Sequence, residues 1–192
     1  MLRQLFTLLL IAFLQNGLLS QGSDETESAE ALCLKLMRYA TIEPELFVEK
    51  VHPDSLKLFR ELVLEFIESV PTEERNVVVK VLFDGTLDEK QVTSATAKHL
   101  YVSFLRKLWS ATPPDMTEFM DKVELTIVGT IAEGEVSHVV VRTSVKDTEY
   151  RKLYIVSFKK HGNAWRALIA EELEFKIRTL IRKQKESNKA PN

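Results

Sequence analysis

The stretch that decides the fold covers residues 123–170 and reads VELTIVGTIAEGEVSHVVVRTSVKDTEYRKLYIVSFKKHGNAWRALIA. Apolar and polar residues alternate in its first part, and three further segments rich in β-branched and aromatic residues follow at 136–145, 150–159 and 164–170. Short polar connections at 133–134, 146–148 and 161–163 separate these segments. Consecutive strands joined by such short turns predict an antiparallel meander.

The two middle strands of this meander are apolar on both sides. One contains Val139, Val140 and Val141, and the other contains the run from Leu153 to Val156. A sheet with one solvated face would alternate apolar and polar residues there, so we expect both faces to be covered. Helices from the first half of the chain can cover one face. The other face needs the C-terminal helix, a ligand-lined cavity or a second subunit.

Outside the meander, apolar residues recur at helical spacing. The pattern predicts helices over 27–41, 44–51, 53–70, 93–110 and 171–186, and a short helical turn over 115–120. The sequence therefore predicts an α+β fold. N-terminal helices (27–120) pack on a curved antiparallel sheet of about four strands (121–170), and a C-terminal helix (171–186) follows.

The segment 72–83 carries mixed signals. Thr72, Glu73 and Glu74 are typical of a helix start, whereas the valines at 77–79 and 81 favour a strand. We favour a helix because the run does not alternate cleanly.

Composition excludes several classes of protein. The chain has 192 residues and a formal net charge of −2, which is unlike a strongly basic polynucleotide binder, so we expect no nucleic-acid partner. Its single cysteine, Cys33, excludes an intrachain disulfide and a cysteine zinc cluster. Cys33 lies beside Leu32 and Leu36 in a helical pattern, which favours a small buried apolar residue over a nucleophile or an intermolecular disulfide.

The N-terminus has the three parts of a secretory signal peptide. Arg3 precedes an apolar run from Leu5 to Leu14, and small residues follow at Ser20 and Gly22. Such a run would be roughly 15 Å long as a helix, about half the thickness of a bilayer core, so we expect no stable membrane span. We therefore predict a cleaved signal peptide at 1–22 and a single secreted or periplasmic domain at 23–192. An uncleaved anchor and a buried N-terminal helix are the alternatives.

The segment 157–168, SFKKHGNAWRAL, resembles the last hairpin of the nuclear transport factor 2-like superfamily. That hairpin often has an apolar strand, a glycine turn, then tryptophan, a basic residue and an aliphatic residue. His52-Pro53-Asp54-Ser55 at a helix start resembles the secreted bacterial members, and the similarity covers residues 31 to about 170. The resemblance implies a cone-shaped fold with a bent sheet around a long helix, a pocket at the wide end and frequent dimerisation through the sheet. No motif matches the catalytic patterns of the enzymatic members, so the resemblance assigns no catalytic residue to this chain.

Four polar residues of the meander are candidate ligand-binding residues. His138 and Arg142 lie on one face of a strand, and Arg166 and Tyr154 are expected to share that face. If the face lines a pocket, these groups would orient a small anionic ligand. The alternative is that they lie at a solvated sheet edge or pair with carboxylates.

Other chemistry finds no support in the sequence. The four histidines lack metal-ligand spacing, and no glycine-rich phosphate loop or nucleophile elbow occurs, so no metal or cofactor is expected. Asp54 has a structural role at a helix N-terminus, so its pairing with His52 is not treated as catalytic. The basic C-terminal residues are expected to be a solvated helix face, with contact to an anionic membrane or polymer as the alternative.

These observations favour an exported non-enzymatic domain that binds a small ligand or a protein partner through a cone pocket or a sheet face. One alternative is a pocket enzyme of the isomerase, dehydratase or hydrolase kind, which rests on the resemblance alone. The other is a homodimeric structural module that buries the apolar strands in an interface.

Overall fold

The computed structural model describes residues 27–110 and 122–188, and its fold is α+β as the sequence predicts. The chain forms two compact units. Residues 27–52 and 122–168 are called the sheet unit, and residues 53–110 and 169–188 the helical unit. The predicted signal peptide and the predicted turn at 115–120 lie outside the described residues, and the prediction of one domain over 23–192 stays a prediction.

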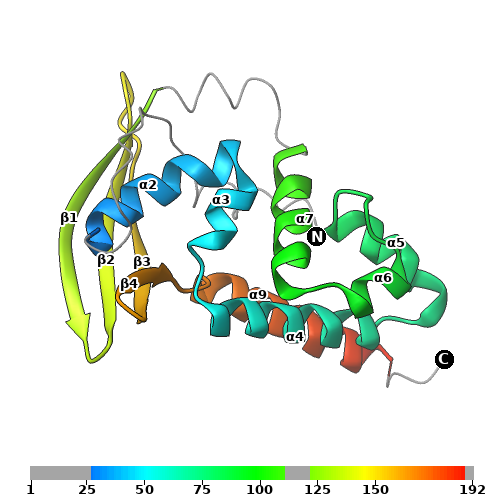
Figure 1. Ribbon diagram of the computed structural model, residues 1–192. Coiled ribbons are helices and arrows are strands. Elements are labelled where there is room, and N and C mark those ends of the chain that lie inside the picture. Colours follow the sequence, from blue (N-terminus) through cyan, green and yellow to red (C-terminus); the bar gives the residue numbers. More distant parts are fainter. Residues whose placement is uncertain (1–26, 111–121, 189–192) are drawn as a thin grey trace. The chain divides into compact units, whose positions relative to one another are not determined.

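The sheet unit contains a four-stranded antiparallel meander (Figure 1). Its strands are β1 (Val123–Glu133), β2 (Val136–Val145), β3 (Arg151–His161) and β4 (Ala164–Ala167), in the order β1-β2-β3-β4. Gly134 and Gly162 have positive φ angles in the first and last turns, which glycine adopts without strain. The predicted meander is confirmed, and a β-bulge at Val128 interrupts its register with β2.

Two helices precede the sheet in this unit, α2 (Ala29–Ile42) and α3 (Pro44–Glu49). Figure 1 shows α2 lying across one face of the sheet. The helix buries Leu32, Cys33 and Leu36, and the sheet buries Val139 and Val141. These apolar side chains form the core of the sheet unit. Their removal from water is the main source of stability at such a contact.

Two polar connections tie the helices to the edges of the sheet. The Thr130 hydroxyl of β1 donates a hydrogen bond to Glu30 Oε1 of α2 at 2.5 Å, and this bond is the main reason that the pKa of Glu30 is below its ordinary value. At the other edge, the His52 N–H donates to the Ala167 carbonyl at 2.8 Å, and the Ala167 N–H donates to the Lys50 carbonyl at 2.8 Å. The chain just after α3 therefore extends the β4 edge.

The helical unit contains α4 (Pro53–Ser69), α5 (Thr72–Leu82), α6 (Glu89–Ser94), α7 (Ala97–Ser110) and α9 (Glu171–Ser187). Helix α4 packs against α5, α7 and α9. Phe59 of α4 meets Tyr101 and Phe104 of α7 with ring centroids 4.7 and 5.3 Å apart. Helix α9 buries Leu173, Ile177 and Ile181 at four-residue spacing, so one stripe of the helix supplies its packing.

Segment 72–83 is helical, as favoured, and α5 ends at Leu82. The single helix predicted over 93–110 is wrong at its start, because two helices meet there. Asp88 and Gln91 form a capping box that begins α6, and the Thr96 hydroxyl accepts a hydrogen bond from the His99 N–H at the start of α7.

Candidate functional site

One face of the sheet is covered by α2, and the strand register defines the other, which we call the open face. The covered face contains Val139, Val141 and Phe158, all fully buried. Residues that pair directly across antiparallel strands lie on the same face, so the register gives the open face as rows of paired residues. From one end to the other, the rows are Glu124, Ser144 and Arg151; Thr126, Arg142 and Leu153; Gly129, Val140 and Ile155; Ile131, His138 and Ser157; Glu133, Val136, Lys159 and Arg166.

Apolar side chains occupy the centre of the open face. Ile131, Leu153 and Ile155 are 60%, 56% and 64% exposed, and they surround the half-buried Val140. In the described part of the chain these side chains are exposed, while α2 lies on the other face. A second subunit was one of the three expected covers of the open face, so the expectation that both faces are covered stays a prediction. The sequence showed correctly that apolar residues project from both faces, but this pattern alone cannot show whether the same chain covers them.

Charged residues lie at both ends of the open face and differ in sign from side to side. Glu124 and Glu133 lie on β1, whereas Arg151 and Lys159 lie in the same two rows on β3. The ion pairs at this face are surface contacts, with Lys146 Nζ 3.7 Å from Glu124 Oε1 and Lys159 Nζ 3.9 Å from Glu135 Oε2. Exposed pairs of this kind contribute little to stability, so these charges remain accessible to a partner.

His138, a predicted ligand-binding residue, lies on the open face and is held by two neighbours. Its Nδ1 is 2.8 Å from the Ser157 hydroxyl, and its Nε2 is 3.2 Å from Glu133 Oε2. Both ring nitrogens are thus engaged within the sheet, and the ring is fixed beside Ile131 in the same row. This arrangement positions the ring as part of the surface.

Arg142 and Arg166 also lie on the open face, but far from each other. Arg142 pairs with Leu153, whereas Arg166 pairs with Lys159, which in turn pairs with Val136. These two rows are six positions apart along β2, a distance of about 20 Å at the rise of a strand. The two guanidinium groups are therefore not brought together around one small anion.

Tyr154 lies on the opposite face, where it pairs with Val141, so its expected place beside His138 and Arg142 is wrong. Its ring is covered by Lys152, whose Nζ lies 4.9 Å from the ring centroid. Alternation along β3 explains the difference, because neighbouring residues of a strand point to opposite faces and the pairing register decides which face is which. A ligand-binding role for His138, Arg142, Tyr154 and Arg166 stays a prediction.

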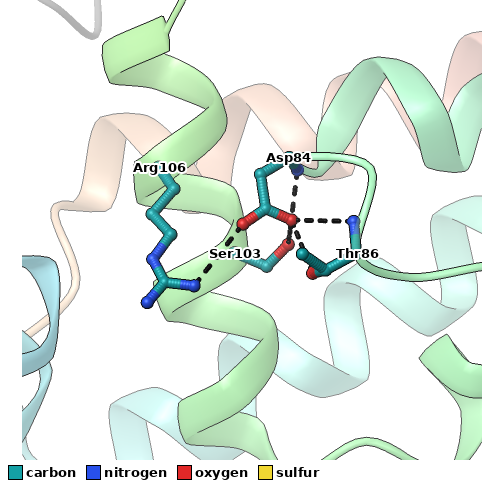
Figure 2. Close-up of polar contacts among 4 residues, drawn as sticks. All are labelled: Asp84, Thr86, Ser103 and Arg106. Atoms are coloured by element: carbon teal, nitrogen blue, oxygen red, sulfur yellow. Dashed lines mark hydrogen bonds and ion pairs between the residues drawn. The ribbon is translucent and has the colours of Figure 1, made fainter.

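A second polar cluster, which the sequence did not reveal, lies in the helical unit (Figure 2). Asp84 Oδ1 accepts hydrogen bonds from the Ser103 hydroxyl at 2.7 Å, the Thr86 hydroxyl at 2.6 Å and the Thr86 N–H at 3.0 Å. Asp84 Oδ2 lies 3.7 Å from Arg106 Nη1. The turn signal at Asp84-Gly85 could have suggested the Thr86 contact, but the partners in α7 are 19 residues or more away in sequence.

The electrostatics of this cluster indicate a structural role. We call Asp84 and its partners Thr86, Ser103 and Arg106 the Asp84 latch. Burial pushes the pKa of Asp84 upward, but the hydrogen bonds from Thr86 and Ser103 and the Arg106 charge outweigh it, so the pKa lies below its ordinary value. The Ser103 hydroxyl is fully buried and donates to this carboxylate while accepting from the Asp84 N–H at 3.3 Å. Asp84 therefore ties the loop after α5 to helix α7.

Cys33 is buried, as predicted, and burial raises the pKa of its thiol to about 12 with a smaller contribution from Glu30. Among residues 27–110 and 122–188, no three His, Cys, Asp or Glu side chains gather in a way that would hold a metal ion. Over the same residues, no helix has the length and apolar character needed to cross a membrane.

Comparison of the chain with family models, with curated proteins and with solved structures finds no match. The resemblance to the nuclear transport factor 2-like superfamily therefore stays a prediction.

Proposed function

We propose that this chain is an exported, non-enzymatic binding domain whose open face docks the apolar surface of a protein partner. The observation that carries the proposal is the exposure of Ile131, Leu153 and Ile155, each more than half exposed, on the two strands that flank β2 on one face of the sheet. A contiguous apolar surface of this kind on a soluble domain marks an interaction site.

The kind of partner follows from the arrangement of the side chains. Small ligands are held in concave sites that remove most of their surface from water. The open face instead offers exposed aliphatic side chains at its centre, such as Ile155, with charged residues such as Glu124 and Lys159 at its ends. An apolar centre with a polar rim is the anatomy of a protein–protein interface.

Site-specific photo-cross-linking tests the proposal. The photoreactive residue p-benzoylphenylalanine replaces Ile155 in one variant and Val77 of α5 in the control, because both native side chains are aliphatic and more than 60% exposed. After irradiation of cells of the source organism, we expect a discrete adduct at position 155 and none at position 77. A further change of Leu153 to Glu should abolish the adduct.

The result that would overturn the proposal is the absence of a discrete adduct at position 155 above the control. The mass of an adduct also shows whether the partner is a second copy, because two copies of the exported chain give twice the mass of one. Loss of the adduct in the Leu153→Glu variant attributes it to the open face rather than to random collision.

A further inference from the structure

The open face carries two kinds of asymmetry between its two sides. The first is charge, since Glu124 and Glu133 lie on β1 while Arg151 and Lys159 face them across β2 in the same rows. Arg166 of β4 pairs with Lys159 and adds to the positive side. The face is therefore acidic along β1 and basic along β3 and β4.

The second asymmetry is side-chain size in the three central rows. Gly129 lies opposite Ile155 across β2, and a Cβ atom built on Gly129 would meet nothing within 4 Å. In the neighbouring rows, Thr126 on β1 accompanies the larger Leu153 on β3, and Ile131 on β1 accompanies the smaller Ser157 on β3. Each central row thus holds a large aliphatic side chain on one side and a small side chain on the other.

We infer that the occupant of the open face is a second copy of this chain, related to the first by a two-fold axis that runs along β2. The inference rests on the proposed function and names the partner. The rotation turns the two open faces toward each other and lays β1 of each copy over β3 of the other. The contact is closed and self-complementary, as a two-fold interface requires. Sheets stacked face to face keep their strands within about 30° of each other, so the rows stay roughly aligned.

Charge complementarity favours this arrangement. Glu124 of one copy comes over Arg151 of the other, and Glu133 comes over Lys159, with each contact repeated by symmetry. Opposite charges around an apolar centre fix the register of an interface and exclude other pairings.

Size complementarity points to the same axis. Ile155 of one copy comes over Gly129 of the other, where the open space receives it. Leu153 likewise comes over Thr126, and Ile131 comes over Ser157. Val140, His138 and Arg142 of β2 lie on the axis, and each meets its own copy. The Arg142 pair is the one contact between like charges in this arrangement. Interdigitation of large and small side chains is what gives packed sheets the density of a protein interior.

The other two-fold arrangement has its axis across the strands. It also places a small residue over a large one in two rows, with Thr126 over Ile131 and Leu153 over Ser157, but its charges and its central row fit less well. It lays β1 over β1 and exchanges the ends of the face, so Glu124 meets Glu133 and Arg151 meets Lys159. It also sets Gly129 over Gly129 and Ile155 over Ile155. Like charges placed opposite each other are unfavourable, and the glycine pair leaves a gap.

Charge reversal with sedimentation velocity of the purified chain tests the inference. We expect a dimer that Glu124→Lys with Glu133→Lys, or Arg151→Glu with Lys159→Glu, weakens by at least about tenfold in Kd. All four changes together restore the opposite charges, and the dimer with them, because acidic and basic sides simply exchange places. The control is Lys152→Glu with Lys160→Glu, which reverses two charges of β3 on the covered face. This control should leave the Kd within about twofold of the unchanged chain.

Two results would overturn the inference. If the chain is monomeric up to about 100 μM, a concentration that exposes even modest dimerisation, no second copy occupies the face. If the variant with all four changes dimerises as weakly as either double variant, the axis along β2 is wrong. A monomer that still forms a discrete adduct of another mass at position 155 leaves the proposed function standing and removes only the second copy. A chain that gives neither a dimer nor an adduct removes both.

Discussion

Gly129 and Ile155 lie in one row of the open face, on either side of Val140. In the two-fold dimer the Ile155 side chain of each copy lies over Gly129 of the other. A larger residue at position 129 would therefore occupy the space that Ile155 needs. We expect Gly129→Leu to weaken the dimer by at least about tenfold, since overpacking costs about 1–3 kcal/mol per site. The monomer tolerates the change because a Cβ at Gly129 meets nothing within 4 Å.

A compensating substitution at Ile155 should restore the dimer that Gly129→Leu weakens. Adding Ile155→Ala to Gly129→Leu places the large side chain on β1 and the small one on β3, which restores the fit. Sedimentation equilibrium should return a Kd within a few-fold of the unchanged chain, while Ile155→Ala alone weakens the dimer. A double variant weaker than both single variants would contradict the alignment of these two residues.

The two faces of β3 predict opposite responses to truncation. Phe158 is fully buried on the covered face, so Phe158→Ala should lower the free energy of unfolding by about 3–5 kcal/mol. Ile155 is 64% exposed, so Ile155→Ala should change the free energy of unfolding of the monomer by no more than about 0.5 kcal/mol. Urea unfolding at a concentration well below the dimer Kd measures both. Equal losses would show that Ile155 is part of the monomer core.

The Asp84 latch predicts a dependence of stability on pH. The pKa of Asp84 is lowered in the folded chain, so its stabilising contribution is present above the unfolded pKa, near 3.8, and is lost as pH falls through the folded pKa. Asp84→Asn should therefore unfold more easily at pH 7 by about 1–3 kcal/mol and lose less stability on acidification below about pH 4. Urea titrations at several pH values provide the measurement.

A double-mutant cycle separates the latch from a general surface charge effect. Ser103→Ala removes the buried hydroxyl that donates to Asp84, so its effect and that of Asp84→Asn should not add. Additive losses, or an acid slope that is the same in Asp84→Asn and the unchanged chain, would contradict the latch.

Cys33 should be chemically inert while the chain is folded. Its thiol is buried and its pKa is raised to about 12, so almost no thiolate exists at pH 8. We expect a thiol-reactive chromogenic disulfide to label the native chain only at the rate of unfolding and to label it at once in urea. Rapid stoichiometric labelling of the native chain would place Cys33 at the surface.

The sequence predicted most of the architecture, because helices and strands whose buried apolar residues recur at regular spacing can be recognised from a short stretch of sequence. The alternation around Val123 and the glycine turns located the meander, and the mixed segment at 72–83 is helical as favoured. Helix α6 was not predicted, since a six-residue helix that buries only Val92 leaves no periodic stripe and depends on its capping box.

The candidate site was less accessible to sequence reasoning. His138, Arg142 and Arg166 do share a face, whereas Tyr154 does not, and the pairing of β3 with β2 decides this difference. Register is a property of two segments together, so neither segment reveals it alone. The Asp84 latch joins a turn to a helix 19 residues away, which no local pattern reports.

Hydroxyl-radical footprinting over a dilution series tests the central claim most directly, since it reads side-chain accessibility on the open face in solution. We predict that labelling of Ile131, Leu153 and Ile155 falls as the chain concentration rises through the dimer Kd, while labelling of Val77 and Phe175, which are also more than half exposed, stays constant. Labelling of Leu153 and Ile155 that stays as strong as that of Val77 at every concentration would contradict burial of the open face by a second copy.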